Sequence, residues 1–138
     1  MADPTVLTRL ATRFGRQCVV LAIDAQQWPE ASGKTGWQVV THSGKKRTGK
    51  DVVEWAKEGV ALGAGEILLT SFDRDGCRGG YDCAMLTAVS SAVATPVIAS
   101  GGCDSPQHMV DALAAGTFTN FFVSVYDKIL IYYNAIIK

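Results

Sequence analysis

The stretch AGEILLTSFDRDGCRGGYD, residues 64–82, is the feature that most constrains how this chain can fold. Its apolar run Glu66–Thr70 is typical of a strand that is buried on both faces of a parallel sheet. Polar side chains and then glycines follow at once: Thr70, Ser71, Asp73, Asp75, Gly76, Gly79 and Gly80. Acids at the C-terminal end of a parallel strand lie where α/β enzymes place their chemistry, but a solvated surface loop has the same composition. The segment alone leaves both interpretations open.

Apolar runs and amphipathic segments alternate along the rest of the chain. A helix is expected over residues 2–15, and further helices over 50–62, 81–94 and from Pro106 onward. Strands are expected over 18–23, 66–70, 96–100 and 118–125. Strands that alternate with helices imply right-handed crossovers and a parallel sheet. The predicted class is therefore α/β, with four parallel strands that are too few to close a barrel.

Two segments stand outside this alternation. Residues 36–41 alternate like one arm of a small hairpin, with 32–34 as its turn. The basic run 43–49 is typical of a flexible loop or of a loop that holds an anion, and it lacks the glycine spacing of a P-loop. Residues 126–138 form an apolar tail that we expect to take part in an interface.

Charge and composition argue against several classes of function. Thirteen basic residues balance thirteen acidic ones, so there is no electrostatic signal for a nucleic-acid or membrane partner. There is no apolar run of membrane length and no signal-peptide pattern, which favours a cytoplasmic location. The four cysteines show no paired spacing and neither histidine lies near one, so we expect free thiols, no metal site and no cofactor.

Five segments, in this order and spacing, closely resemble the C-terminal half of the cyclase subunit of imidazole glycerol phosphate synthase: VLAIDAQ, THSGKKRTG, GAGEILLTSFDRDGCRGGYD, PVIASGG and ALAAG. The resemblance covers residues 3–125. It implies a (βα)4 half of a TIM-type barrel in histidine biosynthesis, organised as one domain. That domain has a leading helix (1–15), four strands with three intervening helices (18–125) and a divergent tail (126–138).

The resemblance also implies roles for particular residues. Asp24 and Asp75 match the family's catalytic acids. A second set matches positions that bind the substrate or its phosphate: Ser43, Thr70, Gly76, Ser100, Gly101, Gly102 and Ser124. Glu66 matches the face where the family docks a glutaminase. The first half of the barrel, with its first-strand acid, has no counterpart among these residues.

These matches leave two functions open. In one, the chain is a half-barrel that binds a phosphorylated ligand, with cyclase activity absent or weak. In the other, it is an active cyclase, a lyase, assembled as a homodimeric or split barrel. Two copies that close an eight-stranded barrel would remove the exposed strand edges of a single sheet.

Overall fold

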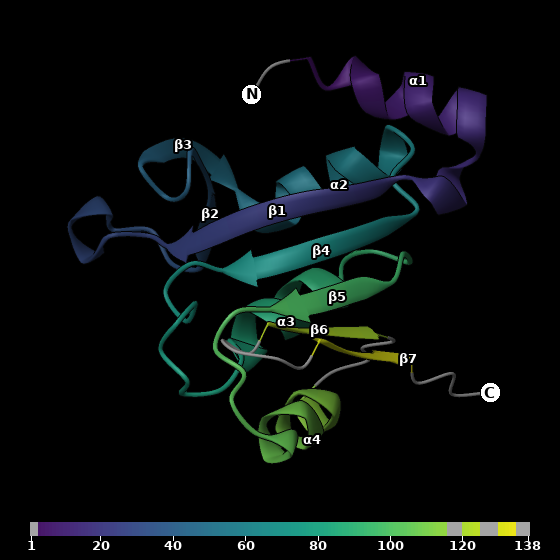
Figure 1. Ribbon diagram of the computed structural model, residues 1–138. Coiled ribbons are helices and arrows are strands. Elements are labelled where there is room, and N and C mark those ends of the chain that lie inside the picture. The colour runs from purple at the N-terminus through teal and green to yellow at the C-terminus, as the bar shows by residue number, and fades with distance from the viewer. Residues whose placement is uncertain (1–2, 116–119, 125–129, 135–138) are drawn as a thin grey trace.

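Four parallel strands form the centre of the structure, a computed structural model that describes residues 3–115, 120–124 and 130–134. They are β1 (Val20–Gln27), β4 (Glu66–Ser71), β5 (Val97–Ser100) and β6 (Asn120–Ser124), and they lie side by side in this order (Figure 1). The sheet does not close on itself. The prediction of an open, partial TIM-type barrel with four parallel strands is confirmed. Residues 118, 119 and 125 of the last predicted strand lie outside the described residues.

Antiparallel strands extend this sheet at both ends, giving the order β3-β2-β1-β4-β5-β6-β7. Strand β2 (Trp37–Thr41) pairs with the end of β1, from Asp24 opposite Val40 to Gln27 opposite Trp37. The strand predicted over residues 18–23 therefore ends later than expected, because β1 continues through Gln26 and Gln27, where β2 supplies the pairing partner.

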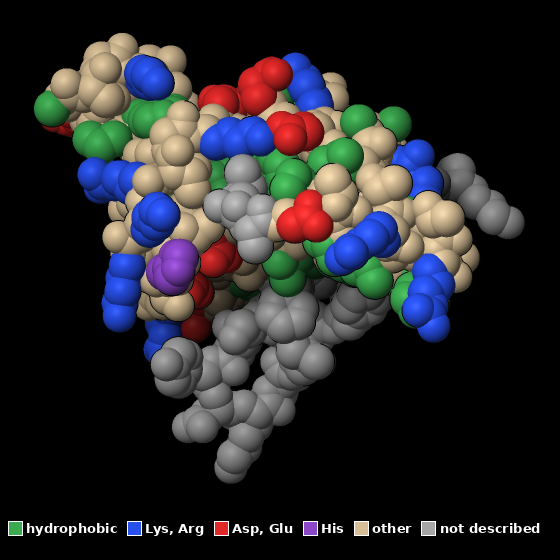
Figure 2. Space-filling model, turned by 90° about the horizontal axis from the view of Figure 1, so that it is seen from above, with side chains coloured by type: hydrophobic (Ala, Val, Ile, Leu, Met, Phe, Trp, Pro, Cys, Tyr) green, Lys and Arg blue, Asp and Glu red, His purple; other side chains and the backbone are tan. Residues whose placement is uncertain are grey.

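The basic run after β2 is mostly a strand. Residues Lys46–Asp51 form β3, which pairs antiparallel with β2, so the prediction of a loop over 43–49 holds only for its first residues. An edge strand such as β3 can carry Lys and Arg because its side chains reach solvent. Such charges protect the unpaired edge from aggregation. Lys and Arg side chains gather around a histidine over this hairpin, at the left of Figure 2.

The described part of the apolar tail also belongs to the sheet. Leu130–Asn134 form β7, which pairs antiparallel with all five residues of β6. We expected β6 to expose its outer edge, and this expectation is wrong. A run of aliphatic and aromatic residues has high β propensity and supplies the hydrogen-bonding partner that an edge strand otherwise lacks.

Four α-helices accompany the strands: α1 (Thr5–Phe14), α2 (Val52–Ala61), α3 (Cys83–Ser90) and α4 (Pro106–Ala115). Short 3-10 turns lie at Arg16–Cys18 and Glu30–Ser32. Polar side chains determine where three of these helices begin. Asp51 accepts the N–H groups of Val53 and Glu54, Asp82 accepts that of Met85, and Ser105 Oγ accepts that of His108.

The hydrophobic core lies between one face of the sheet and helices α2 and α3 (Figure 1). Ile23, Leu69 and Ala99 line this face on successive strands and are buried. Trp55 of α2 is only 6% exposed and packs in this core. The opposite face of the parallel strands carries no helix in Figure 1, and there Val20 is 49% exposed.

One hydrogen bond ties the β2 hairpin to helix α3. Trp37 Nε1 donates to Asp82 Oδ2 at 2.8 Å, and Asp82 is only 8% exposed. The same carboxylate caps α3 through its other oxygen. A buried carboxylate with two donors is well satisfied, and it becomes costly when one donor is removed.

Replacing Trp37 with phenylalanine keeps an aromatic ring but removes this N–H. We expect Trp37→Phe to lower the free energy of unfolding by about 1.5–3 kcal/mol, the range for a hydrogen bond to a charged group, measured by urea denaturation. Trp28→Phe is the control, because the ring of Trp28 contacts the Lys34 ammonium and a phenylalanine ring retains that contact. Equal losses for the two variants would contradict the role of the Trp37–Asp82 bond.

Candidate functional site at the C-terminal ends of the parallel strands

The registers of three parallel strands place three polar residues in one row. Asp24 of β1 lies opposite Thr70 of β4, and Thr70 lies opposite Ser100 of β5. Residues in register on neighbouring strands point to the same face, and here it is the face without helices. All three are half-buried. The row is close to the ends at which the strands deliver their loops, where parallel α/β sheets bind ligands.

Asp24 has an unusual electrostatic environment. Burial raises the pKa of this carboxyl group above its ordinary value of 3.8, and the negative charge of Asp75 raises the pKa further. Asp75 itself lies on the exposed loop after β4. The structure thus brings the two predicted acids close enough to influence each other, although they are 51 positions apart in the sequence.

Two hydrogen bonds hold the loop after β4 over the strand ends. Its Asp75 N–H donates to the Ser71 carbonyl at 2.9 Å, and Asp73 Oδ2 accepts the Gln27 N–H at 2.7 Å. Asp73 therefore fastens the loop to the extended end of β1. This role of Asp73 was not predicted, because it depends on the extension of β1 through Gln27.

Two consecutive glycines allow the same loop to approach the end of β5. Gly101 and Gly102 have φ values of +92° and +91°, a region that side chains disfavour. A Cβ on Gly101 would lie 2.7 Å from the Ser71 carbonyl oxygen, and the Gly102 carbonyl accepts the Gly80 N–H at 2.8 Å. The PVIASGG segment is thus in direct contact with the DRDGCRGG segment.

Gly76 and Ser124 also belong to the predicted phosphate-binding set, but they lie on separate segments from the glycine pair 101–102. Gly76, with φ +74°, lies on the exposed part of the loop with open space around it. Ser124 lies at the end of β6, which pairs with β5 through Asn120 and Phe121. Gly101 and Gly102 also lead into α4, whose first turn begins at Pro106. The strand ends therefore bring Gly76, Gly101, Gly102 and Ser124 to one edge of the sheet.

Ser43 lies in the tight turn between β2 and β3. His42, Ser43 and Gly44 all have left-handed backbones, with φ of +56°, +53° and +76°. The Phe72 ring fills the space beside Gly44 where a Cβ would otherwise lie. The sequence did not indicate that Phe72 positions this turn, since an aromatic residue after a strand is most often a core residue.

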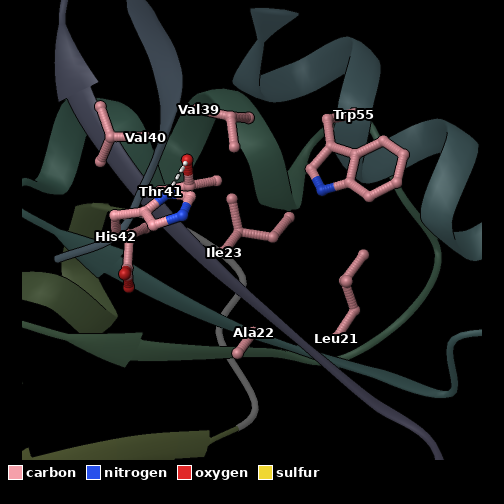
Figure 3. Close-up of a pocket in the computed structure, with 9 residues that line it drawn as sticks. Leu21, Ala22, Ile23, Val39, Val40, Thr41, His42 and Trp55 are labelled. Carbon is pink, nitrogen blue, oxygen red and sulfur yellow. Dashed lines mark hydrogen bonds between the residues drawn. The ribbon is translucent and has the colours of Figure 1, made fainter. Parts of the chain in front are cut away.

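A pocket of about 350 Å³ lies beside β1 and below this turn (Figure 3). Its walls come from β1, β2 and α2: Leu21, Ala22, Ile23, Asp24, Val39, Val40, Thr41, His42 and Trp55. His42 Nδ1 and Thr41 Oγ1 are 3.1 Å apart at its rim. The pocket thus has an apolar floor, and Asp24 is among its polar lining residues.

Two buried polar atoms in the described residues have no hydrogen-bonding partner. They are Gln38 Nε2 on β2 and Ser71 Oγ on β4, and both residues are almost fully buried. Ser71 was among the polar residues that the sequence placed after the buried run, whereas Gln38 was not singled out, and neither lines the pocket. Across residues 3–115, 120–124 and 130–134, no three His, Cys, Asp or Glu side chains gather as metal ligands would. In the same ranges no helix is long and apolar enough for a membrane span.

Comparisons with known proteins agree with this geometry. The family described as histidine biosynthesis protein matches residues 1–125. Imidazole glycerol phosphate synthase subunits HisF from Nocardia farcinica (strain IFM 10152), Mycobacterium tuberculosis (strain ATCC 25177 / H37Ra) and Mycobacterium leprae (strain TN) are each 48% identical over 128 residues. Each match covers 91% of this chain and 50%, 48% and 49% of those proteins, respectively. The chain therefore spans about half the length of the curated relatives it matches.

The raised pKa of Asp24 predicts a pH-dependent stability. Protonated Asp24 favours the folded state below pH 3.8, and this contribution is lost as the pH rises through the folded-state pKa. At neutral pH the ionised carboxylate therefore destabilises the fold relative to a neutral amide. We expect Asp24→Asn to raise the melting temperature at pH 7, with a difference that shrinks toward pH 3.

The exposed aspartate Asp111 provides the matched control, since Asp111→Asn also removes one negative charge. Its effect on the melting temperature should not follow the pH dependence of Asp24→Asn. A difference for Asp24→Asn that stays constant between pH 3 and pH 7 would contradict the desolvation of Asp24.

Proposed function

Since the chain belongs to the histidine biosynthesis protein family, we propose that residues 1–138 form one half-barrel domain that binds a phosphorylated ligand at the C-terminal ends of its parallel strands. One observation carries this proposal. The row of Asp24, Thr70 and Ser100 lies beside the glycine pair 101–102, so an acid, two hydroxyls and backbone N–H groups share one edge.

The phosphate site consists of backbone N–H groups rather than cationic side chains. Gly101 and Gly102 lie between the end of β5 and the start of α4, and the N-terminus of a helix attracts anions. Gly76 supplies a further flexible backbone position on the facing loop, and Ser124 a position at the end of β6. Thr70 and Ser43 are placed to contact the remainder of the ligand.

Asp24 and Asp75 carry whatever proton transfer the domain performs. Asp24 is half-buried and Asp75 is exposed on the loop above it, and each supplies a carboxyl group that can exchange a proton with a ligand at the strand ends. The family's first-strand acid has no counterpart here, so cyclase activity is absent or weak in the chain by itself. The alternative is an active cyclase assembled as a homodimeric or split barrel, which the open sheet favours.

Two partners follow from the same proposal. A second copy that closes the barrel would have to displace β7 from the edge of β6, or pair elsewhere. A glutaminase subunit would dock at the opposite end of the sheet from the ligand, where Glu66 begins β4. The relatives are named as subunits of a synthase, which supports an assembly with a further protein.

Titration with inorganic phosphate tests the ligand site. We expect phosphate to raise the melting temperature and to shift the amide signals of Gly102 and Ser124, while chloride at equal ionic strength does neither. Gly76→Ala should raise the dissociation constant severalfold. Gly33→Ala is matched, because Gly33 also has a left-handed backbone and open space around it but lies in another loop. Identical phosphate affinity in both variants, or no response up to tens of millimolar, would overturn the proposed site.

Turnover of the cyclase substrate with ammonia tests the catalytic part. We expect a rate roughly 10²–10⁴-fold below that of a full-length relative, because one of two placed acid/base groups is absent. Asp24→Asn should abolish the remaining turnover with the circular dichroism spectrum unchanged. Glu58→Gln, on the exposed side of α2, is the control and should leave turnover unaltered. Residual turnover that survives Asp24→Asn would show that the chemistry lies elsewhere.

A further inference from the structure

The imidazole ring of His108 lies between two loops of the proposed phosphate site. One is the loop after β4, residues 72–82, which leads to α3. The other is the segment 101–105, which joins β5 to α4. In Figure 1 both loops leave the sheet at the same end and run down to their helices. His108 is the third residue of α4 and is half-buried, so its ring is close to the backbone of both loops.

Two contacts connect the ring to these loops. On one side, Nδ1 of His108 accepts the backbone N–H of Asp104 at 3.2 Å. On the other side, the ring lies against Gly80, where an added Cβ would be 3.5 Å from Cδ2 and 3.7 Å from Cγ. The Gly80 N–H in turn donates to the Gly102 carbonyl at 2.8 Å. The ring therefore contacts both loops next to the hydrogen bond that joins them.

The hydrogen bond from Asp104 defines the state of the imidazole. A ring nitrogen that accepts an N–H carries no hydrogen itself, so the ring is neutral and its hydrogen is on Nε2. A second proton would occupy Nδ1 and remove the acceptor. Histidine is the side chain that commonly gains or loses this proton between about pH 5 and 8. The contact with Asp104 therefore exists only while the ring is neutral.

Charges of both signs surround the ring. The titratable groups on the neighbouring segments are Arg74, Arg78 and Tyr81 on the loop after β4, Asp82 and Cys83 at the start of α3, Cys103 and Asp104 before α4, and Asp111 on α4. Arg78 Nε is 3.8 Å from Asp104 Oδ1, so this acid already has a cationic neighbour. A positive ring in the first turn of α4 also meets the positive end of the helix dipole. The neighbouring charges oppose one another, and the lost Nδ1 acceptor is the main consequence of protonation.

We infer that His108 is a positioning residue for the glycine pair 101–102 of the proposed phosphate site. Its neutral ring holds the segment 101–105 against the loop after β4, and this contact fixes the backbone that presents the N–H groups of the pair. The inference rests on the ligand site proposed above, but it does not require cyclase turnover. His108 itself does not contact the ligand. Protonation of the ring therefore weakens anion binding, although a positive charge beside an anion would by itself strengthen it.

Nuclear magnetic resonance of the chain without ligand tests the two contacts. We expect the amide signals of Asp104 and Gly80 to shift between pH 8 and pH 5 together with the ring signals of His108. His108→Asn should abolish these shifts, because the asparagine oxygen takes the place of Nδ1 as acceptor and does not titrate in this range. His108→Leu has a similar branched shape beside Gly80 but offers no acceptor, so its Asp104 amide signal should be displaced at every pH.

Affinity for inorganic sulfate, followed at the Gly102 amide, tests the consequence for the site. Sulfate keeps both negative charges throughout this range, whereas phosphate does not. At pH 8 we expect His108→Asn to bind as the unmodified chain does, and His108→Leu to bind about three- to tenfold more weakly, as the loss of one neutral hydrogen bond implies. At pH 5 the unmodified chain should be as weak as His108→Leu, while His108→Asn keeps its affinity. A side chain that only supports the fold would not give this rescue.

Gln107→Ala is the matched control. Gln107 lies in the same turn of α4, and its side chain donates to Asp111 within the helix at 2.8 Å. Its loss should leave sulfate affinity unchanged at both pH values. Circular dichroism verifies folding of each variant. If His108→Leu does not fold, the comparison of His108→Asn with the unmodified chain across pH still decides the question.

Three outcomes would overturn the inference. They are amide signals of Asp104 and Gly80 that do not follow the ring, a pH dependence of sulfate affinity that persists in His108→Asn, and tighter binding by the unmodified chain at pH 5. The last of these would mean that the charged ring contacts the anion itself. A different result separates the two proposals: if no variant binds sulfate or phosphate while the amide shifts occur and His108→Asn removes them, the ligand site is wrong and the His108 contact is confirmed.

Discussion

The parallel pairing of β1 with β4 is the constraint on which the rest of the structure depends. Six residue pairs, from Val20 opposite Glu66 to Ala25 opposite Ser71, fix the relative height of the two strands. A slip of one residue would turn Asp24 toward the helices and expose Ile23. The burial of Ile23 and Leu69 against α2 and α3 therefore also sets the position of Asp24 beside Thr70.

Close backbone contact between the loop after β4 and the glycine pair after β5 extends this fixed arrangement from the strands to the candidate site. The loop after β4 touches Gly101 and Gly102, and at each of these glycines the loop leaves no room for a side chain. Asp73 joins the same loop to the end of β1. Three segments that are far apart in the sequence thus form one polar edge, and the strand registers rather than flexible side chains determine its geometry. On the side of β1 that faces away from β4, Val20 and Ala22 have no strand partner among the described residues.

The local sequence predicted which helices and strands form more accurately than it predicted the residues at which they end. Buried runs such as Glu66–Thr70 and the helix signal at Pro106 were sufficient, because burial and helix initiation act over a few residues. The extension of β1, the strand Lys46–Asp51 and the burial of Trp55 could not be read locally. Gln26, Gln27 and Lys46 have weak strand propensity, and they become strand residues only when β2 lies alongside them.

For the candidate site, the sequence by itself determined that strands carry Asp24, Thr70 and Ser100 toward one end of a parallel sheet. It could do so because a polar residue at the end of a buried run is a local pattern. Only the tertiary structure decided that Asp75 lies near enough to raise the pKa of Asp24, that the Phe72 ring lies against the Ser43 turn, and that β7 pairs with β6. These facts depend on contacts between distant segments, and a local pattern contains no information about the partner.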